Sequence, residues 1–335
     1  MRVFRTRRAR GTAAGRLGIV LGALTAAVAA VAVVPGVASA HGAASHAAAT
    51  AASAQATVTH RPHFIQNTTV DDAAHLQSLG YTVLDVGPGE SADLPAGMQG
   101  MEWTGGAICD SDGIMSWADF RALVDSNRNS SKVFGYFIFD EPDTHGCTNI
   151  ASKLRDRADY IHCSGWRNSF WDGAKQHPKV DNAGNCLDAS GNIIPRKTSQ
   201  KAYLVDEYSH DYAAVAKSIT HVDLFGLDPY PCNKDGSTTC DMSQVDDAAA
   251  TAKQYYAESE LAPVYQVFGG DGWKIPSATQ LQNLLAEWDR VLPGAGADVV
   301  YSYRDNKNGG PEDTYPGLSH ATNLEPILSA HNAAT

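Results

Sequence analysis

The stretch Val133-Phe134-Gly135-Tyr136-Phe137-Ile138-Phe139-Asp140-Glu141-Pro142 is an unbroken apolar and aromatic run that ends in two carboxylates and a proline. A strand that is buried on both faces in a parallel sheet reads as a continuous hydrophobic run. We therefore predict a buried strand with Asp140 and Glu141 at its C-terminal end, at the edge of a low-dielectric core. Such burial raises a carboxyl pKa and can keep the group protonated near neutrality. The alternative interpretation is a strand end followed by a solvated acidic turn.

Seven further apolar runs of strand length accompany this one. The eight expected strands are His63–Asn67, Tyr81–Val86, Gly100–Trp103, Val133–Asp140, Ala202–Asp206, Val222–Leu227, Pro263–Phe268 and Val299–Tyr303. Patterns of helical period separate most of them. The expected helices are Asp71–Leu79, Trp117–Asn127, Ile150–Ile161, Asp211–Ile219, Gln244–Glu258 and Ala278–Val291. Only the connection between the second and third strands lacks a helical pattern.

Strands that alternate with helices favour right-handed βαβ units and a parallel sheet. Eight such units in about 270 residues match one α/β domain, a single (β/α)8 TIM barrel with disulfide-stapled loops. The alternative is a doubly wound sheet, which normally carries a Gly-rich phosphate-binding turn after its first strand. No such turn follows the first predicted strand, so we favour the barrel.

Barrels of this kind place their chemistry at the C-terminal ends of the strands. Carboxylates that can move protons, amides that can hold hydroxyls and aromatic rings that can stack on sugars fall at these ends. The candidate residues are Gln66, Asp85, Trp103, Asp140, Glu141, Asp206, Asp228, Tyr230, Gln266, Tyr303 and Arg304. The set predicts a site for a polysaccharide or oligosaccharide.

The Asp-Glu-Pro end of the fourth predicted strand resembles the Asn-Glu-Pro that carries the acid/base in clan-A glycoside hydrolases. Three stretches, Gly135–Pro142, Phe225–Pro231 and Val264–Gly269, are also similar to a looser group of secreted glycosidase-like barrels. The resemblance covers most of residues 60–330 in order. It implies hydrolysis of O-glycosyl bonds, with Glu141 as the proton donor and Asp140 either orienting Glu141 or holding a substrate hydroxyl.

The chain departs from the clan at Gln266, where retaining members keep a nucleophilic glutamate at the end of strand seven. A neutral amide cannot form the glycosyl ester, so two mechanisms stay open. In an inverting reaction, Glu141 protonates the leaving oxygen while Asp228 activates a water molecule. In a substrate-assisted reaction, which an adjacent Asp-Glu pair also resembles, Asp140 orients the acetamide of an N-acetylated sugar and Glu141 donates the proton.

Two other classes of protein stay open beside the enzyme. In a carbohydrate-binding barrel without turnover, Gln266 would mark the loss of catalysis. A cell-surface protein could also borrow the same scaffold, because a fold does not determine a function.

Residues 1–40 have the features of a secretory signal peptide: a basic start, an apolar run from Leu17 to Val34 and small residues at 38–40. Arg7 and Arg8 hint at twin-arginine export, and an uncleaved membrane anchor is the alternative interpretation. Residues 41–59 are mostly Ala, Ser, His and Thr, which predicts a disordered linker. The predicted catalytic domain is therefore 60–335.

The predicted mature chain is strongly acidic. The signal segment holds six arginines and no acidic residue, so the remainder carries 20 basic and 37 acidic side chains, a formal net charge of −17 against −11 for the whole chain. This balance argues against nucleic acid and anionic membranes as partners. No later apolar run reaches the length of a membrane span. We expect a secreted, extracellular monomer.

Six cysteines lie beyond the signal segment: Cys109, Cys147, Cys163, Cys186, Cys232 and Cys240. An even number in an exported protein predicts three disulfides, for which fifteen connectivities exist. Cys232 and Cys240 flank a short polar loop, which favours a local bridge, and the other four would staple loops near Asp110, His145 and Asn185. No Cys-x-x-Cys pair or metal-spaced histidine set occurs, so we predict no metal and no cofactor in catalysis. The segments 181–192 and 305–313 could hold a structural calcium ion, although neither follows the calcium-loop pattern.

Overall fold

The structure is a computed structural model that describes residues 61–106, 114–166, 171–172, 177–206, 211–233, 238–270, 272–307 and 314–335. The predicted signal peptide, the predicted linker, Cys109 and Asp110 lie outside these residues.

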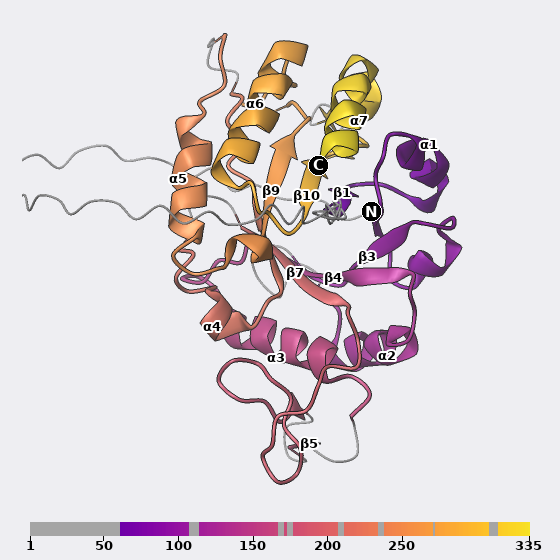
Figure 1. Ribbon diagram of the computed structural model, residues 1–335, viewed down its shortest axis with the longest axis vertical. Helices are drawn as coiled ribbons and strands as arrows, with labels where there is room; N and C mark the ends of the chain where they lie inside the picture. The colour runs from indigo at the N-terminus through magenta and orange to yellow at the C-terminus, as the bar shows by residue number, and fades with distance from the viewer. Residues whose placement is uncertain are drawn as a thin grey trace, which may run out of the picture. The chain divides into compact units, whose positions relative to one another are not determined.

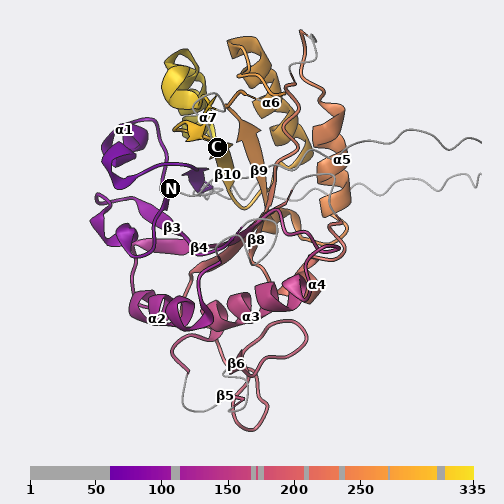
Figure 2. The same ribbon diagram turned by 180° about the vertical axis from the view of Figure 1, so that it is seen from behind.

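Eight parallel strands close into a barrel in the order β1-β2-β3-β4-β7-β8-β9-β10, with β10 pairing back to β1. The strands are β1 (His63–Ile65), β2 (Val83–Val86), β3 (Gln99–Trp103), β4 (Val133–Asp140), β7 (Lys201–Asp206), β8 (Leu224–Leu227), β9 (Leu261–Gln266) and β10 (Asp298–Tyr301). Figures 1 and 2 show the helices on the outside of this barrel. The predicted (β/α)8 fold and the order of its eight strands are confirmed.

Seven α-helices occur in the described part of the chain. They are α1 (Ala73–Ser78), α2 (Trp117–Asn127), α3 (Ile150–Cys163), α4 (Lys217–Thr220), α5 (Ser243–Ala252), α6 (Ala278–Val291) and α7 (Glu325–Ala334). The bounds of α2 and α6 are those predicted, and the β2–β3 connection carries only a 3₁₀ turn at Glu90–Asp93.

One helix prediction was wrong, and one helix was missed. The prediction over 211–219 fails for most of its length, because the Asp211 side chain accepts the amide of Ala213 and favours a turn there. The extended backbone of Ala216 then delays the helix to Lys217. The C-terminal helix α7 was not predicted.

Two apolar layers flank the barrel sheet, since neighbouring side chains along a strand point to opposite faces. The inner layer fills the barrel and contains Phe64, Val83, Met101, Phe137, Tyr203, Val205, Leu224, Ala262, Val264, Ala297 and Val299. The outer layer joins the sheet to the helices, and its strand members include Ile65, Leu84, Tyr136, Ile138, Phe139, Leu204, Phe225, Leu227, Tyr265 and Val300.

Strand β4 breaks this alternation by one residue. The register pairs Phe137 with Tyr203 and then Phe139 with Leu204, which leaves Ile138 as an extra residue. Ile138 and Phe139 consequently both belong to the outer layer. This two-against-one pairing is a β-bulge.

The bulge decides the direction of the next side chain. Asp140 pairs with Val205, which belongs to the inner layer. Strict alternation from Phe137 would have placed Asp140 on the outer face, so the extra residue turns its carboxyl toward the barrel interior. The loop after β3 holds the bulge, because the amides of Thr104 and Gly105 both donate to the Phe137 carbonyl at 3.0 Å.

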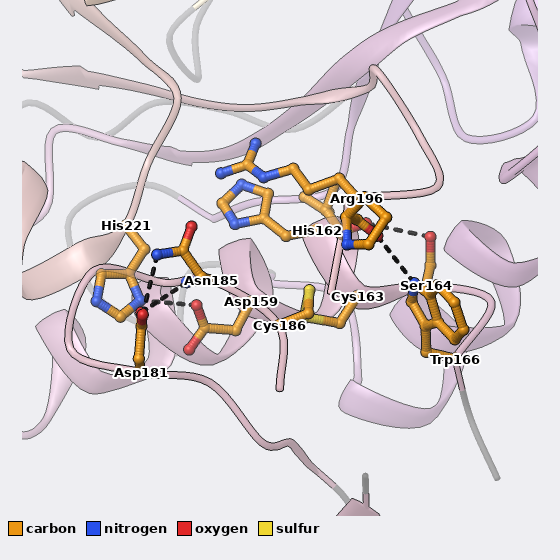
Figure 3. Close-up of a disulfide and its surroundings, with 12 residues drawn as sticks. Asp159, His162, Cys163, Ser164, Trp166, Asp181, Asn185, Cys186, Arg196 and His221 are labelled. Carbon is orange, nitrogen blue, oxygen red and sulfur yellow. Dashed lines mark hydrogen bonds and ion pairs between the residues drawn. A yellow bond between two sulfur atoms is a disulfide. The ribbon is translucent and has the colours of Figure 1, made fainter. Parts of the chain in front are cut away.

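A long excursion, residues 164–200, separates α3 from β7 and contains the short antiparallel pair β5 (Trp171–Asp172) and β6 (His177–Pro178). A disulfide between Cys163 and Cys186 fastens it to the end of α3 (Figure 3). The predicted local bridge between Cys232 and Cys240 is confirmed, and no described cysteine is free.

The acidic turns of the excursion use their carboxylates internally. Asp181 accepts the amides of Ala183 and Asn185, and Asp188 accepts those of Ser190 and Asn192. The Asp and Asn residues of 181–192 therefore stabilise turns through side-chain hydrogen bonds to nearby backbone amides. Within the ranges given above, no cluster of three or more His, Cys, Asp or Glu side chains could hold a metal ion.

Asp223 connects the excursion to the barrel. Its Oδ2 atom lies 2.7 Å from His162 Nε2 and accepts the amide of Ala202, and its Oδ1 atom lies 2.6 Å from an Arg196 nitrogen (Figure 3 shows His162 and Arg196). Burial opposes ionisation of Asp223, but the hydrogen bond from His162 and the positive charge of Arg196 outweigh it and hold the pKa of Asp223 below its ordinary value. The charged form of Asp223 is therefore the one that the fold stabilises.

Replacing Asp223 by Asn should lower the free energy of unfolding near pH 7 by about 1–3 kcal/mol, because buried donors lose a charged acceptor. Since the pKa of Asp223 is lower in the folded state, its contribution is complete above the pKa of an unfolded aspartate, about 3.9, and is lost as the pH falls below that value. Urea unfolding from about pH 7 to about pH 3 should show the two proteins converging in acid. The exposed Asp93→Asn is the control, and parallel pH profiles would contradict the role of Asp223.

Candidate active site

Three aspartates lie near one tyrosine at the C-terminal end of the barrel. Asp85 on β2, Asp140 at the end of β4 and Asp228 just after β8 all interact electrostatically with the Tyr203 hydroxyl on β7. The register predicts the same grouping, because side chains on inward positions of neighbouring strands converge on the barrel axis. Four strands thus bring together residues that lie up to 143 positions apart in the chain.

Tyr203 is the member of this group that belongs to the inner apolar layer. Its side chain is fully buried in the inner layer, and its hydroxyl has no hydrogen-bond partner among the described residues. Gly226 on β8 leaves room for it, since a Cβ atom there would lie 2.5 Å from the Tyr203 hydroxyl and 2.3 Å from Val205 Cγ2. Sequence reasoning missed Tyr203. Its inward direction follows only from the strand register.

Two of the aspartates have strongly raised pKa values. Burial raises the pKa of Asp140 to about 7, and the negative charges of Asp85 and Asp206 add to the effect. Burial also raises the pKa of Asp85 to about 7, against a hydrogen bond from the Asn67 amide to Asp85 Oδ2 at 3.2 Å. Near neutral pH, the interior end of the barrel therefore holds carboxyl groups that are partly protonated.

Glu141 follows Asp140 in an unusual backbone conformation. Its φ of 45° lies in the left-handed region, which costs a residue with a side chain about 1–3 kcal/mol. The Glu141 amide donates to the Val205 carbonyl at 3.0 Å, which anchors this turn on β7. The side chain is half-buried and interacts electrostatically with Tyr230. The turn therefore keeps Glu141 beside the interior carboxylates.

Aromatic rings form two groups at the same end of the barrel. Trp103, at the end of β3, packs edge-on against Phe137 with the ring centres 4.5 Å apart. In the second group, the Tyr230 ring contacts those of Phe268, Tyr301 and Trp273, with ring centres 4.8, 5.8 and 6.2 Å apart. We call Tyr230, Phe268, Tyr301 and Trp273 the aromatic cluster. Trp273 lies in a loop beyond the predicted strands and was not expected.

Two predicted site residues lie away from this group. Arg304 is exposed and donates two hydrogen bonds to the carboxylate of Asp72, at 2.7 and 2.9 Å. Tyr303 packs against the outer layer and lies near the ring of His75, at 6.3 Å. Both side chains thus contact the region of α1, because the chain leaves the barrel interior after Tyr301.

The remaining predicted residues are buried. Gln66 is 4% exposed, and its backbone amide donates to the Val300 carbonyl. Asp206 is fully buried and pairs with Leu227 of the outer layer, and it interacts electrostatically with both Asp140 and Tyr256.

The two polar groups of the fully buried Gln266 side chain are bonded to backbone. Its carboxamide oxygen accepts the Cys232 amide, and its nitrogen donates to the carbonyls of Cys232 and Lys274. Both amide hydrogens are therefore in use, so we leave Gln266 out of the substrate contacts proposed below.

No protein-family model matches the chain, and no curated protein sequence matches it. Solved structures with a similar fold include a β-galactosidase from the psychrophilic Marinomonas ef1, at 12% identity and a TM-score of 0.47 over 80% of this chain. The chain spans 59% of the length of that galactosidase.

Two further similar structures are the GH5_18 protein from Streptomyces cattleya in complex with GlcNAc and a chitinase from Chromobacterium violaceum. The first has 10% identity and a TM-score of 0.49 over 81% of this chain and 80% of its own. The second has 9% identity and a TM-score of 0.45 over 82% of this chain and 99% of its own. At these values the likeness carries no inference about activity, and the barrel fold rests on the strand pairing.

Replacing Asp85 by Asn should lower the pKa of Asp140, because it removes a negative charge that disfavours the ionised form. The value should fall below about 7 but stay above that of a solvated aspartate, since burial is the larger cause. Carboxyl ¹³C NMR titration would measure it, with Asp140→Asn to assign the signal. Asp93→Asn should leave the titration midpoint of Asp140 unchanged. An unchanged midpoint in Asp85→Asn would contradict the placement of Asp85 near Asp140.

Proposed function

We propose that this protein is a secreted glycoside hydrolase that acts on an extracellular polysaccharide or oligosaccharide. The observation that carries the proposal is the gathering of Asp85, Asp140 and Asp228 around Tyr203, with Glu141 beside them. Carboxyl groups with raised pKa values at the C-terminal end of a barrel are suited to acid–base work near neutral pH. Trp103 and the aromatic cluster at the same end add apolar faces suited to stacking on sugar rings.

In this proposal Glu141 is the general acid. It protonates the leaving glycosidic oxygen as the bond from that oxygen to the anomeric carbon breaks. Its half-buried side chain, held by the strained turn after Asp140, suits contact with a substrate at the barrel end. Without a glutamate at position 266, the electron pair that replaces the leaving group comes either from water or from the substrate.

The different burial of Asp140 and Asp228 favours the substrate over water as the source of this electron pair. Asp228 is 1% exposed, whereas Asp140 is half-buried, so Asp140 is the better placed of the two to touch a sugar. In the substrate-assisted reaction, the acetamide oxygen of an N-acetylated sugar bonds to the anomeric carbon while Asp140 orients the acetamide. Water then opens the cyclic intermediate. In the inverting alternative, Asp228 takes a proton from the attacking water.

A carbohydrate-binding barrel without turnover is the second candidate function. The bonding of Gln266 favours it, because a residue engaged with three backbone groups supplies no nucleophile. The two candidates make opposite predictions for hydrolysis and the same prediction for binding.

Export is part of the proposal. The disulfides Cys163–Cys186 and Cys232–Cys240, both among the described residues, are typical of an oxidising compartment outside the cytosol. In the described part of the chain, no helix combines the length and apolar character needed to cross a bilayer. The proposed partner is a glycan alone, and the protein is expected to act as a monomer.

Replacing Glu141 by Gln should reduce hydrolysis by about 10²–10⁴-fold, because the variant cannot supply the proton. The full chain in its exported form would be screened for release of reducing ends from plant, fungal and bacterial polysaccharides. Glu287→Gln is the matched control and should keep full activity, because Glu287 is a half-buried glutamate of the outer helix α6 that pairs with Arg290. If the wild type and Glu141→Gln bind one glycan equally and neither releases reducing ends, the binding protein is the correct description.

The first-formed anomer of the product should have the configuration of the substrate. A substrate-assisted reaction makes two successive displacements at the anomeric carbon, and each one inverts its configuration. Proton NMR during early hydrolysis would determine the configuration of this anomer. Asp140→Asn should then reduce the rate more than Asp228→Asn, and cleavage should require N-acetylated sugars. An inverted first product would instead select Asp228 as the base.

A further inference from the structure

Gln266 stands at the end of β9, where a retaining enzyme of the resembling clan would carry its nucleophile. We propose that Gln266 is a positioning residue that locks two loops of the barrel end into one unit and thereby holds Tyr230 and Trp273 of the aromatic cluster. The proposal deepens the proposed function, because it assigns the unit to glycan binding, but its central claim concerns the loops alone.

The first loop follows β8 and carries Tyr230. Cys232 in this loop is fully buried and donates its amide to the Gln266 carboxamide oxygen at 2.9 Å. Its carbonyl accepts the Gln266 nitrogen at 3.0 Å, so one side chain satisfies both backbone groups of Cys232. The disulfide to Cys240 closes the same loop on its far side.

The second loop follows β9 and carries Trp273. The Gln266 nitrogen also donates to the Lys274 carbonyl at 3.2 Å, and the Lys274 amide donates to the Cys232 carbonyl at 3.0 Å. Trp273 and Gly270 exchange backbone hydrogen bonds of 2.8 and 3.0 Å within this loop. Three groups from two loops therefore meet on a single carboxamide.

The carboxamide is matched to this task by its chemistry. It offers one acceptor and two donors in fixed geometry, and the two loops present one amide and two carbonyls. A glutamate at the same place would keep the acceptor but would point a negative oxygen at the carbonyls of Cys232 and Lys274. The residue that would restore a nucleophile is therefore the one that would break the contact between the loops.

The aromatic cluster depends on both loops. Tyr230, with a φ of 44°, comes two residues before Cys232, and Trp273 comes directly before Lys274. Their rings meet nearly at right angles, and Phe268 contacts both at 4.8 and 5.6 Å. Separating the loops would therefore displace the two rings relative to each other. On the proposed function, it would weaken the stacking of a sugar more than the proton transfer.

The test is Gln266→Glu, studied by hydrogen exchange of peptides containing Cys232 and Lys274 and by the indole NMR signal of Trp273, assigned with Trp273→Phe. At about pH 8 these peptides should exchange about ten-fold faster than in the wild type, and the indole signal should move, because the carbonyls of Cys232 and Lys274 lose the hydrogen bonds from Gln266 and face a negative oxygen instead. At about pH 5 both should return toward the wild type. Burial raises the pKa of the introduced carboxyl, and its protonated form again donates one hydrogen bond.

The matched control is Gln200→Glu. Gln200 is also buried, and its nitrogen donates to the carbonyl of Asn127, but it lies directly before β7 at the opposite end of the strands. This variant should lose stability while leaving Trp273 and the two loop peptides unchanged. Equal effects of both variants on Trp273, or no effect of Gln266→Glu at about pH 8, would overturn the proposal. If Gln266→Glu does not fold, Gln266→Met removes the same bonds without adding a charge and is judged by the same signals.

Binding of chitotetraose and cellotetraose then separates this proposal from the proposed function. For a probe that binds the wild type, Gln266→Glu should raise Kd at about pH 8, and the Kd of this variant should return toward the wild-type value near about pH 5. Gln200→Glu should leave Kd unchanged at both pH values. Any gain of hydrolysis in Gln266→Glu would overturn the positioning role, because it would mark position 266 as a vacant nucleophile. If the wild type binds neither probe, the glycan assignment fails for these sugars, and the exchange and indole measurements still decide the role of Gln266.

Discussion

The arrangement of the candidate site depends on one extra residue in β4. The bulge at Ile138 shifts the register by one position, so that Asp140 faces the barrel interior instead of the helices. The carboxyl then lies near Asp85 and Tyr203, where burial and like charge raise its pKa. A continuous apolar strand without the bulge would keep the fold and lose this group, because side chains alternate strictly between the two faces of a sheet.

The barrel end divides into two parts with different physical demands. At β2 and β4 the carboxyl groups of Asp85 and Asp140 are partly desolvated near Tyr203, an arrangement that costs stability and favours the protonated forms. In the loops after β8 and β9, a polar side chain instead joins two segments of backbone, since Gln266 makes hydrogen bonds to backbone groups of both loops. The barrel end therefore combines carboxyl groups with raised pKa values and an aromatic cluster whose loops are joined through Gln266.

Much of the fold was accessible from local patterns. The eight strands, the bounds of α2 and α6 and the bridge between Cys232 and Cys240 each follow from signals that lie within a few neighbouring residues. The predicted site residues lie in two places. Asp85, Asp140, Glu141 and Asp228 were expected at one end of the barrel and lie there, whereas Tyr303 and Arg304 contact the α1 region. Tyr203 was missed because an aromatic residue inside a hydrophobic run does not reveal which face it takes.

The sequence by itself determined the class of fold and the end of the barrel where polar groups gather, because hydrophobic period and strand order are local properties that a parallel barrel converts directly into position. Only the tertiary structure decided the inward turn of Asp140, the space that Gly226 leaves for Tyr203 and the three backbone partners of Gln266. Each of these depends on the pairing of strands or loops that are distant in the chain. A single inserted residue or a neighbouring glycine changes such pairing without changing the pattern that a sequence displays.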